Sequence, residues 1–295
     1  MNPKMVNREG EEVVNVQNKK IFKKIIQHIL MITFTLIMIY PLLWMVSSSF
    51  KESSTVFIDA HTLIPKAFKF SNYSVGWDGF AGISFSTFFK NSFIITFIAT
   101  FGSVISSTII AYGFSRIRFI GRNLWFVCML LTLMLPFEMV MIPQYIMFNK
   151  FGWIDTYLPL ILPTFFGTPF FIFLIMQFIR TIPRELDDAA KIDGCSNFGI
   201  FWRIIVPLIV PAMMTSAIFS FYWRWDDFMS PLIYLSTPEK YPVSLALKLF
   251  SDPDSVTNWG AMFAMSTLSL VPIFVIFFLF QRYIVEGIST SGLKS

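Results

Sequence analysis

Charged residues are scarce in this sequence. Asp, Glu, Lys and Arg make up 14% of the 295 residues, whereas a soluble domain has about a quarter. Hydrophobic residues make up 55%, with 36 Phe among them, and the mean hydropathy is +0.64. This composition excludes a large soluble domain and predicts an integral membrane protein.

Cysteine and histidine are also scarce. Cys128 and Cys195 lie far apart, and His28 and His61 are isolated, so that neither a disulfide framework nor a metal site follows from them. The sequence lacks a Ser/His/Asp set, a nucleotide-binding glycine loop and an HExxH motif. These absences predict a protein that is not an enzyme and holds no catalytic residue, metal or cofactor. The pI of about 9.1 fits positive loops at a membrane and requires no nucleic-acid partner.

Long apolar runs, in contrast, are abundant. Six are long enough to cross a bilayer, which takes about 20 residues: 29–46, 93–114, 124–142, 158–179, 204–222 and 259–280. Only Glu138 carries a charge inside these runs. The predicted fold is therefore an all-α membrane protein with six transmembrane helices.

The placement of Lys and Arg predicts the orientation of these helices. With both termini in the cytoplasm, most of the 23 basic residues lie on the inner side, as the positive-inside rule requires. We therefore expect residues 1–28 to form a cytoplasmic tail and an interfacial helix. Residues 29–282 form the transmembrane domain, with a cytoplasmic loop at 180–206, and residues 283–295 form a cytoplasmic tail.

Proline recurs inside or beside the apolar runs, at positions 41, 136, 159, 163, 169, 207, 211 and 272. Each proline removes a backbone donor and favours a kink. Kinks are tolerated in lipid where neighbouring helices or a water-filled cavity satisfy the freed groups. The pattern fits a transporter, although kinks that only improve packing explain part of it equally well.

The longest charge-rich segment between two apolar runs begins near Pro183. Proline suits a first helical position, and three acids that complement a helix dipole follow it: Glu185, Asp187 and Asp188. Gly194 is suited to end the helix. The segment therefore predicts a surface helix of about three turns that turns sharply at Gly194.

This segment resembles the EAA loop of ATP-binding-cassette importers. That motif reads Glu-Ala-Ala, three residues, Gly, nine residues, Ile, one residue and Leu-Pro. Its spacing is matched by Asp188, Ala189, Ala190, Gly194, Ile204, Val206 and Pro207, with Asp replacing Glu and Val replacing Leu. The resemblance implies a coupling helix that docks into a partner ATPase through Glu185, Asp188, Ala189, Ala190 and Gly194. An ordinary acidic cytoplasmic loop is the alternative.

The resemblance extends over residues 29–295, through the segments 40–51, 111–116, 225–228, 241–245 and 281–287. It is closest to the maltose-type second permease subunit of oligosaccharide importers. The resemblance implies the type I ABC importer permease fold and a multi-pass protein of the bacterial cell membrane. It also implies a homologous permease partner, an extracytoplasmic solute-binding protein and two ATPase subunits, which bind ATP and Mg in place of this chain. In the resembled subunit, the C-terminal tail reaches into the ATPase interface; a frayed terminus is the alternative.

The end of the fifth apolar run combines aromatic and polar residues that suit a sugar path: Tyr222, Trp223, Arg224, Trp225, Asp226 and Asp227. An interfacial aromatic belt explains the aromatic residues equally well. If Arg224 faces a cavity, its guanidinium could bind a carboxylate in bidentate fashion, and the cargo would then be an acidic, uronic-acid-containing oligosaccharide. If Arg224 is held by Asp226 or Asp227, or extends to the membrane interface, the cargo is neutral.

Glu138 is a second candidate for the substrate path, because an acid inside a membrane run is costly to desolvate. The alternative is an acid near the outer end of the run that reaches water. Taken together, the sequence predicts a permease subunit that imports oligosaccharides by alternating access, driven by ATP. Three alternatives remain open at this point: an ABC permease for another small solute, a secondary transporter driven by an ion gradient, and a membrane enzyme.

Overall fold

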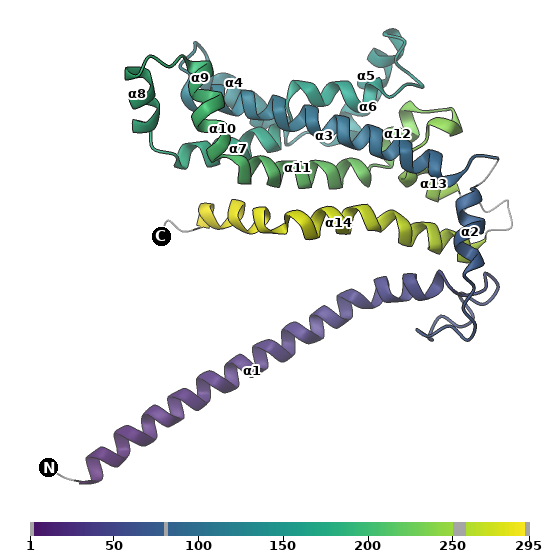
Figure 1. The fold of residues 1–295 in the computed structure, drawn as a ribbon, viewed down its shortest axis with the longest axis horizontal. Helices are drawn as coiled ribbons and strands as arrows, with labels where there is room; N and C mark the ends of the chain where they lie inside the picture. Colours follow the sequence, from purple (N-terminus) through teal and green to yellow (C-terminus); the bar gives the residue numbers. More distant parts are fainter. Residues whose placement is uncertain (1–2, 80–81, 250–257, 293–295) are drawn as a thin grey trace.

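The structure is a computed structural model that describes residues 3–79, 82–249 and 258–292 (Figure 1). The elements of these residues are all helices. They are α1 (Pro3–Ser48), α2 (Ser71–Asp78), α3 (Phe85–Arg116), α4 (Arg122–Thr132), α5 (Phe137–Lys150), α6 (Leu158–Ile161), η1 (Leu162–Phe166), α7 (Pro169–Thr181), α8 (Glu185–Ile192), α9 (Asn197–Ile200), η2 (Phe201–Ile205), α10 (Val206–Leu208), α11 (Val210–Trp225), α12 (Met229–Tyr234), η3 (Pro238–Lys240), α13 (Val243–Leu249) and α14 (Trp259–Gly292).

Four helical segments are long and apolar enough to cross a membrane without a sharp break: Phe22–Ser48, Phe85–Arg116, Leu158–Thr181 and Trp259–Tyr283. Two bent pairs of helices bring the number of candidate spans to six if each pair is one span: α4 with α5, bent by 101°, and α9–α10 with α11, bent by 73°. These six segments coincide with the six predicted apolar runs. The prediction of an all-α membrane protein is confirmed, and the third and fifth spans prove to be broken.

The two breaks occur where proline interrupts the backbone ladder. Pro136 has an extended conformation (φ −60°, ψ 143°) between α4 and α5, which ends one helix and starts another. In the fifth span, a π-helical turn at Phe201–Ile205 precedes Pro207, and Pro211 follows the bend at Ile209. Each proline lacks the N–H that would continue the ladder of backbone hydrogen bonds. π-helical turns also occur as local interruptions of α-helices.

α3 is the central packing element, because it contacts both α7 and α11, and α11 in turn contacts α14. Small residues on its buried face allow close approach. A Cβ on Gly102 would lie 2.5 Å from the ring of Phe165. Two hydroxyl groups of α3 contact the short interruption between η1 and α7: Ser107 Oγ accepts from Thr168 N at 3.0 Å, and Ser103 Oγ lies 2.7 Å from Thr168 Oγ1.

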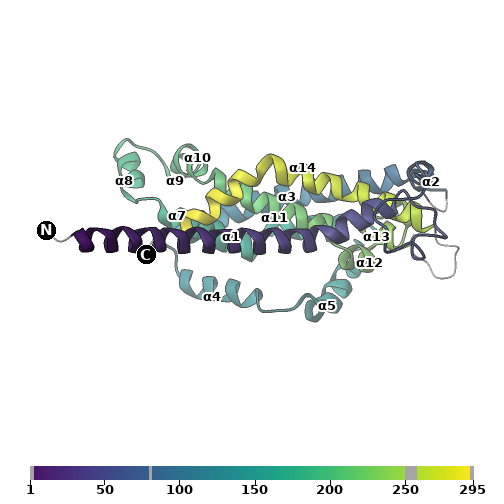
Figure 2. The same cartoon turned by 90° about the horizontal axis from the view of Figure 1, so that it is seen from below.

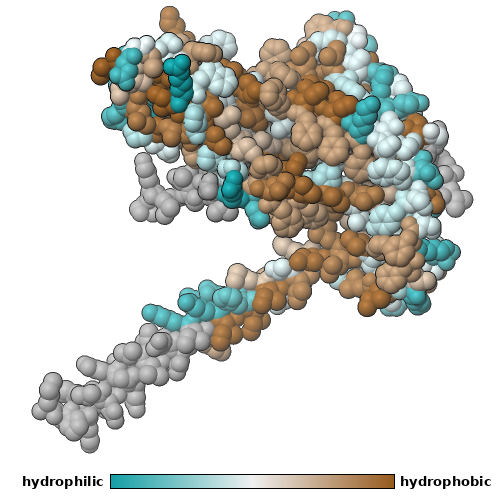
Figure 3. All heavy atoms as spheres, viewed as in Figure 1, coloured by the Kyte–Doolittle hydropathy of each residue, from teal (hydrophilic) through white to brown (hydrophobic). Residues whose placement is uncertain are grey.

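α1 stands away from the other helices over most of its length (Figure 1). No residue of its most apolar stretch is buried, and where its side chains are coloured in the space-filling view, apolar residues cover much of the surface toward its C-terminal end (Figure 3). Near its end, Trp44 anchors it: Nε1 donates to Ala60 O at 2.8 Å, and the ring meets Phe263 edge-on at 5.3 Å. In a membrane, the exposed stretch must face lipid or another subunit.

The N-terminal end of α1, the C-terminal end of α14 and α8 lie at the same end of the molecule (Figure 2). This arrangement fits termini on one side of the membrane, whereas the cytoplasmic assignment stays a prediction. α1 continues without a break through residue 28, and α14 continues through residue 282; the domain boundaries drawn there stay predictions. The contact of the C-terminal tail with the ATPases, which the resemblance implies, concerns residues 281–295, whose side chains lie outside the described part of the chain from residue 284 on.

At the opposite end of the molecule, Asp155 joins two loops. Its backbone has a φ of +59°, and its N–H donates to Tyr234 O at 2.8 Å. Its carboxylate accepts from Ser236 N, Thr237 N and Thr237 Oγ1, and from Lys240 Nζ at 2.7 Å. The Lys240 hydrogen bond is the largest cause that holds the pKa of Asp155 well below its usual range. We refer to this set of contacts as the Asp155 latch.

Candidate coupling surface and translocation path

The predicted surface helix is present as α8, and it ends as the sequence predicts. Gly194 has a φ of +80°, a conformation that L side chains rarely adopt. The turn satisfies the last carbonyls: Gly194 N donates to Lys191 O, and Cys195 N donates to Ala190 O at 2.9 Å. The helix begins at Glu185 rather than at Pro183 and has about two turns, because Pro183 and Arg184 form the preceding turn.

One face of α8 is buried and the rest of the helix is free. Asp187 and Ala190 are buried, one turn apart, whereas the other predicted coupling residues are exposed: Glu185, Asp188, Ala189 and Gly194. Two apolar side chains share the free surface, Leu186 at 44% exposed and Ile192 at 88%. The free face is therefore mixed acidic and apolar, a composition suited to a protein partner.

The buried charge of Asp187 is met by Arg116 at the end of α3. Arg116 Nε lies 3.1 Å from Asp187 Oδ2, with the two side chains 5% and 9% exposed. Arg116 Nη2 also donates to Ile182 O at 2.8 Å and to Ile179 O at 3.3 Å. A buried ion loses its hydration and is tolerated only when paired and hydrogen-bonded. The pair therefore fixes α8 to the end of a membrane span.

Two further hydrogen bonds join α3 to the loop that contains α8. Arg184 Nη2 donates to Ser115 O at 3.2 Å, and Tyr112 Oη donates to Asn197 O at 3.0 Å. Around them, the largest buried apolar cluster extends from Ala190 on α8 to α3, α7 and α11. A displacement of α8 would therefore be transmitted directly to three spanning helices. Sequence reasoning missed Arg116 as a functional residue. The available signal was that Arg116 is the first of three arginines after the second apolar run, in a loop on the same predicted side as the acid-rich segment.

The predicted substrate-path residues at the end of α11 fall on different faces. Tyr222 and Trp223 are 45% and 43% exposed, whereas Trp225 is 4% exposed. Trp225 Nε1 donates to Ser269 O at 3.0 Å, and its ring stacks on Phe221 at 5.6 Å. The side chain of Trp225 thus packs α11 against α14 in this conformation.

Arg224 lies beside Asp227 rather than alone. Arg224 Nη1 is 3.9 Å from Asp227 Oδ2, and Asp227 Oδ1 also accepts from Ser230 N at 3.1 Å at the start of α12. Asp226 is exposed, and its pKa is raised by partial burial and by the carboxylate of Asp227. The cluster thus contains one cation and two acids. Ser92 and Thr96 lie with Arg224 and Asp227 around a cavity of about 10 Å³, about the space of one water molecule.

Glu138 is not part of this cluster. It is exposed in the first turn of α5, just after the break at Pro136, where an acid complements the helix dipole. Among the described residues, no group of three or more His, Cys, Asp or Glu is arranged to hold a metal ion. The roles of Glu138 and of the α11 residues stay predictions, as does the assignment of ATP and Mg to partner subunits.

Comparison with known proteins decides the family. Residues 103–290 match the family described as "Binding-protein-dependent transport system inner membrane component". The chain belongs to this family. It is a multi-pass inner-membrane permease subunit of an ABC transporter and not an enzyme, and the sequence-based recognition is confirmed. Family membership also decides against the secondary transporter and the membrane enzyme.

Individual relatives agree with this assignment. The permease is 37% identical to the probable ABC transporter permease protein YurM of Bacillus subtilis over 256 residues, 86% of this chain and 83% of the relative. It is 32% identical to the arabinooligosaccharides transport system permease protein AraQ of Halalkalibacterium halodurans, over 88% of this chain and 92% of the relative.

A solved structure shares the fold of the permease. It is a chain of a bacterial ABC transporter involved in the import of the acidic polysaccharide alginate. The TM-score is 0.79 at 23% identity, over 90% of this chain and 96% of that chain. The predicted ABC importer permease fold is thereby confirmed.

Proposed function

We propose that this permease forms half of the membrane channel of an oligosaccharide importer, together with a homologous permease subunit. Two ATPase subunits bind and hydrolyse ATP on the cytoplasmic side, and a solute-binding protein delivers the sugar from outside. The oligosaccharide class is supported by the named cargo of the AraQ relative and by the aromatic and polar side chains at the end of α11.

The observation that carries the coupling mechanism is the buried Arg116–Asp187 pair. The exposed face of α8 docks into a partner ATPase. Closure of the ATPases moves α8 as a rigid body, and the pair transmits this movement to α3 and, through the apolar cluster, to α7 and α11. Access to the sugar site thereby alternates between the two sides of the membrane.

The charges at the end of α11 favour a neutral cargo over an acidic one. Arg224 faces Asp227, and with Asp226 the local charge is net negative, which opposes a carboxylate-bearing sugar. The adjoining cavity of about 10 Å³ is far too small for a sugar ring, since small-molecule sites occupy about 300 Å³ or more. The sugar site therefore forms between this subunit and its permease partner.

The test is uptake by the reconstituted importer. The permease, its permease partner, the ATPases and the binding protein are placed in liposomes, with labelled neutral and uronic-acid-containing oligosaccharides outside. We expect uptake of a neutral oligosaccharide that requires both ATP at the ATPase side and the binding protein. Uptake that persists without either component contradicts the proposed mechanism, and uptake of acidic sugars alone contradicts the proposed cargo.

A further inference from the structure

We propose that an arginine-lined cleft beside α8 binds the headgroup of an anionic phospholipid. The cleft lies between the turn that joins α3 to α4 and the connection from α7 to α8. It consists of two cavities of about 470 Å³ each, and Arg122 lines both. The cleft adjoins the exposed face of α8 at Glu185, which lines the second cavity, whereas no residue at the end of α11 lines either cavity.

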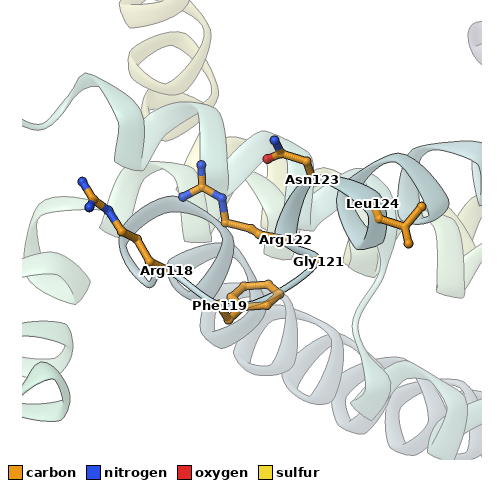
Figure 4. Close-up of a pocket in the computed structure, with 6 residues that line it drawn as sticks. All are labelled: Arg118, Phe119, Gly121, Arg122, Asn123 and Leu124. Atoms are coloured by element: carbon orange, nitrogen blue, oxygen red, sulfur yellow. The ribbon is translucent and has the colours of Figure 1, made fainter.

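The turn between α3 and α4 supplies two of the arginines. Gly121 has a φ of +77°, and the chain reverses there so that Arg118 and Arg122 extend to the same side of the turn (Figure 4). The first cavity is lined by Arg118, Phe119, Gly121, Arg122, Asn123 and Leu124. Its size is within the range of small-molecule sites.

The second cavity brings further arginines from another part of the chain. Its charged lining residues are Arg116, Arg122, Arg180, Arg184 and Glu185. Arg116 is already paired with the buried Asp187, and Glu185 offsets one more charge. The cleft therefore keeps an excess of positive charge, contributed by two loops that are distant in the sequence.

The key arginines are available to a ligand. The structure gives the side chains of Arg118 and Arg122 neither a hydrogen bond nor an ion pair with any described residue. Arg180 lies over the ring of Phe126 at 5.9 Å, which leaves its N–H groups free along the plane of the guanidinium. A guanidinium binds phosphate oxygens in a bidentate, charge-assisted geometry, so a phosphate would satisfy these donors.

The surroundings of the cleft select a lipid among phosphate-bearing ligands. Ile120 at the tip of the turn is 99% exposed, and Leu124 and Trp125 on α4 are 66% and 61% exposed. No residue of α4 is buried. An exposed apolar helix beside a basic cleft at the end of the spans can take acyl chains along the helix and the phosphate among the arginines. Basic pockets of this kind between membrane helices recognise anionic headgroups.

Lipid binding is measured on the full-length permease in detergent by native mass spectrometry. The permease is titrated with dioleoylphosphatidylglycerol or, in parallel, with dioleoylphosphatidylcholine. We expect phosphatidylglycerol adducts that persist after the detergent is removed, and few phosphatidylcholine adducts. In the triple variant Arg118→Gln, Arg122→Gln, Arg180→Gln, we expect phosphatidylglycerol affinity to fall by about 100-fold, since each arginine near an anionic headgroup contributes about fivefold.

Arg203→Gln is the matched control, because it removes one arginine at the same end of the molecule outside both cavities. It should retain the adducts. If the triple variant does not elute as a folded species, Arg122→Gln alone should weaken binding about fivefold, and Arg122→Lys should restore part of it. Equal adducts on all variants would show that positive loops attract lipid without a site. Thermal stabilisation by inorganic phosphate equal to that by phosphatidylglycerol would show a site for a free anion instead; either result overturns the proposal.

Discussion

Two arginines end two neighbouring spans, each beside an aspartate, and their environments differ. Arg116 at the end of α3 lies 3.1 Å from Asp187, and both side chains are nearly inaccessible. Arg224 at the end of α11 lies 3.9 Å from Asp227, with the side chains 33% and 20% exposed. Arg116 also donates through Nη2 to two carbonyls, which holds its guanidinium in place. The comparison shows that the same residue pair is short and buried at one site and longer and partly exposed at the other.

The largest effect is expected from breaking the buried pair. Asp187→Ala leaves Arg116 as an uncompensated buried charge and should lower the free energy of unfolding by about 3–5 kcal/mol. It should also reduce sugar-stimulated ATP hydrolysis more than ATPase assembly, because α8 loses its attachment to α3. Thermal unfolding, ATPase co-purification and ATP hydrolysis measure these three quantities.

The control for the buried pair lies on the same helix. Lys191 Nζ is 3.1 Å from Asp188 Oδ1, but both side chains are more than half exposed. Lys191→Gln should therefore change the unfolding free energy by less than about 0.5 kcal/mol. Equal losses from Lys191→Gln and Asp187→Ala would remove the distinction between buried and exposed pairs.

A smaller effect is expected at the turn that ends α8. The Cβ that Gly194→Ala adds would have no atom within 4 Å, but the φ of +80° at this position costs an L residue about 1–2 kcal/mol. Uptake should fall with stability, because the turn orients α8 toward the ATPase. Gly113 on α3 also has open space around it and lies within a helix, so Gly113→Ala should be neutral or slightly stabilising. Thermal shift and uptake are compared for both variants; a harmless Gly194→Ala would contradict the required turn.

The Asp155 latch tests whether a carboxylate that accepts several hydrogen bonds stabilises the fold although it is only partly buried. Asp155→Asn keeps the size of the side chain and removes its charge, and should cost about 1 kcal/mol at pH 7. Because the pKa of Asp155 is lowered in the folded state, its contribution is fully present above the unfolded pKa of about 3.9. It is lost as the pH falls below that value.

The pH dependence provides the measurement for the latch. The difference in unfolding free energy between wild type and Asp155→Asn should be constant from about pH 5 to pH 8 and shrink below about pH 4. A difference that grows on acidification would contradict a role of the ionised carboxylate.

The smallest effect is expected at Arg224. Arg224 is partly exposed, and its partner Asp227 also accepts a hydrogen bond from Ser230 N. Arg224→Gln should therefore lower the free energy of unfolding by less than about 1 kcal/mol. Uptake of a neutral oligosaccharide should be nearly unchanged. Uptake assays with this variant sharpen the comparison, since a large loss confined to an acidic sugar would show that Arg224 binds cargo after all.

Local sequence patterns predicted most of the fold. The six apolar runs, the interruptions near Pro136, Pro207 and Pro211 and the acid-rich helix ending at Gly194 all depend on neighbours in the chain and are found at the expected places. In contrast, α1 and α14 continue as helices through Pro41 and Pro272. The length of α8 was overestimated by about a turn, because helix propensity does not locate the first residue after a proline. The severity of the bend at Pro136, 101°, also could not be predicted, since a proline breaks a helix without fixing the direction of the next one.

By itself, the sequence determined that this chain spans a membrane and carries a charged surface helix, because hydrophobicity and helix signals are properties of contiguous residues. Only the tertiary structure decided which charges meet. Asp187 and Asp188 are adjacent and chemically identical, yet one is buried against Arg116 and the other is exposed beside Lys191. Trp223 and Trp225 on α11 likewise differ in burial, since Trp223 is 43% exposed and Trp225 is 4% exposed. Burial depends on which helices pack together, and partners distant in the sequence set that packing.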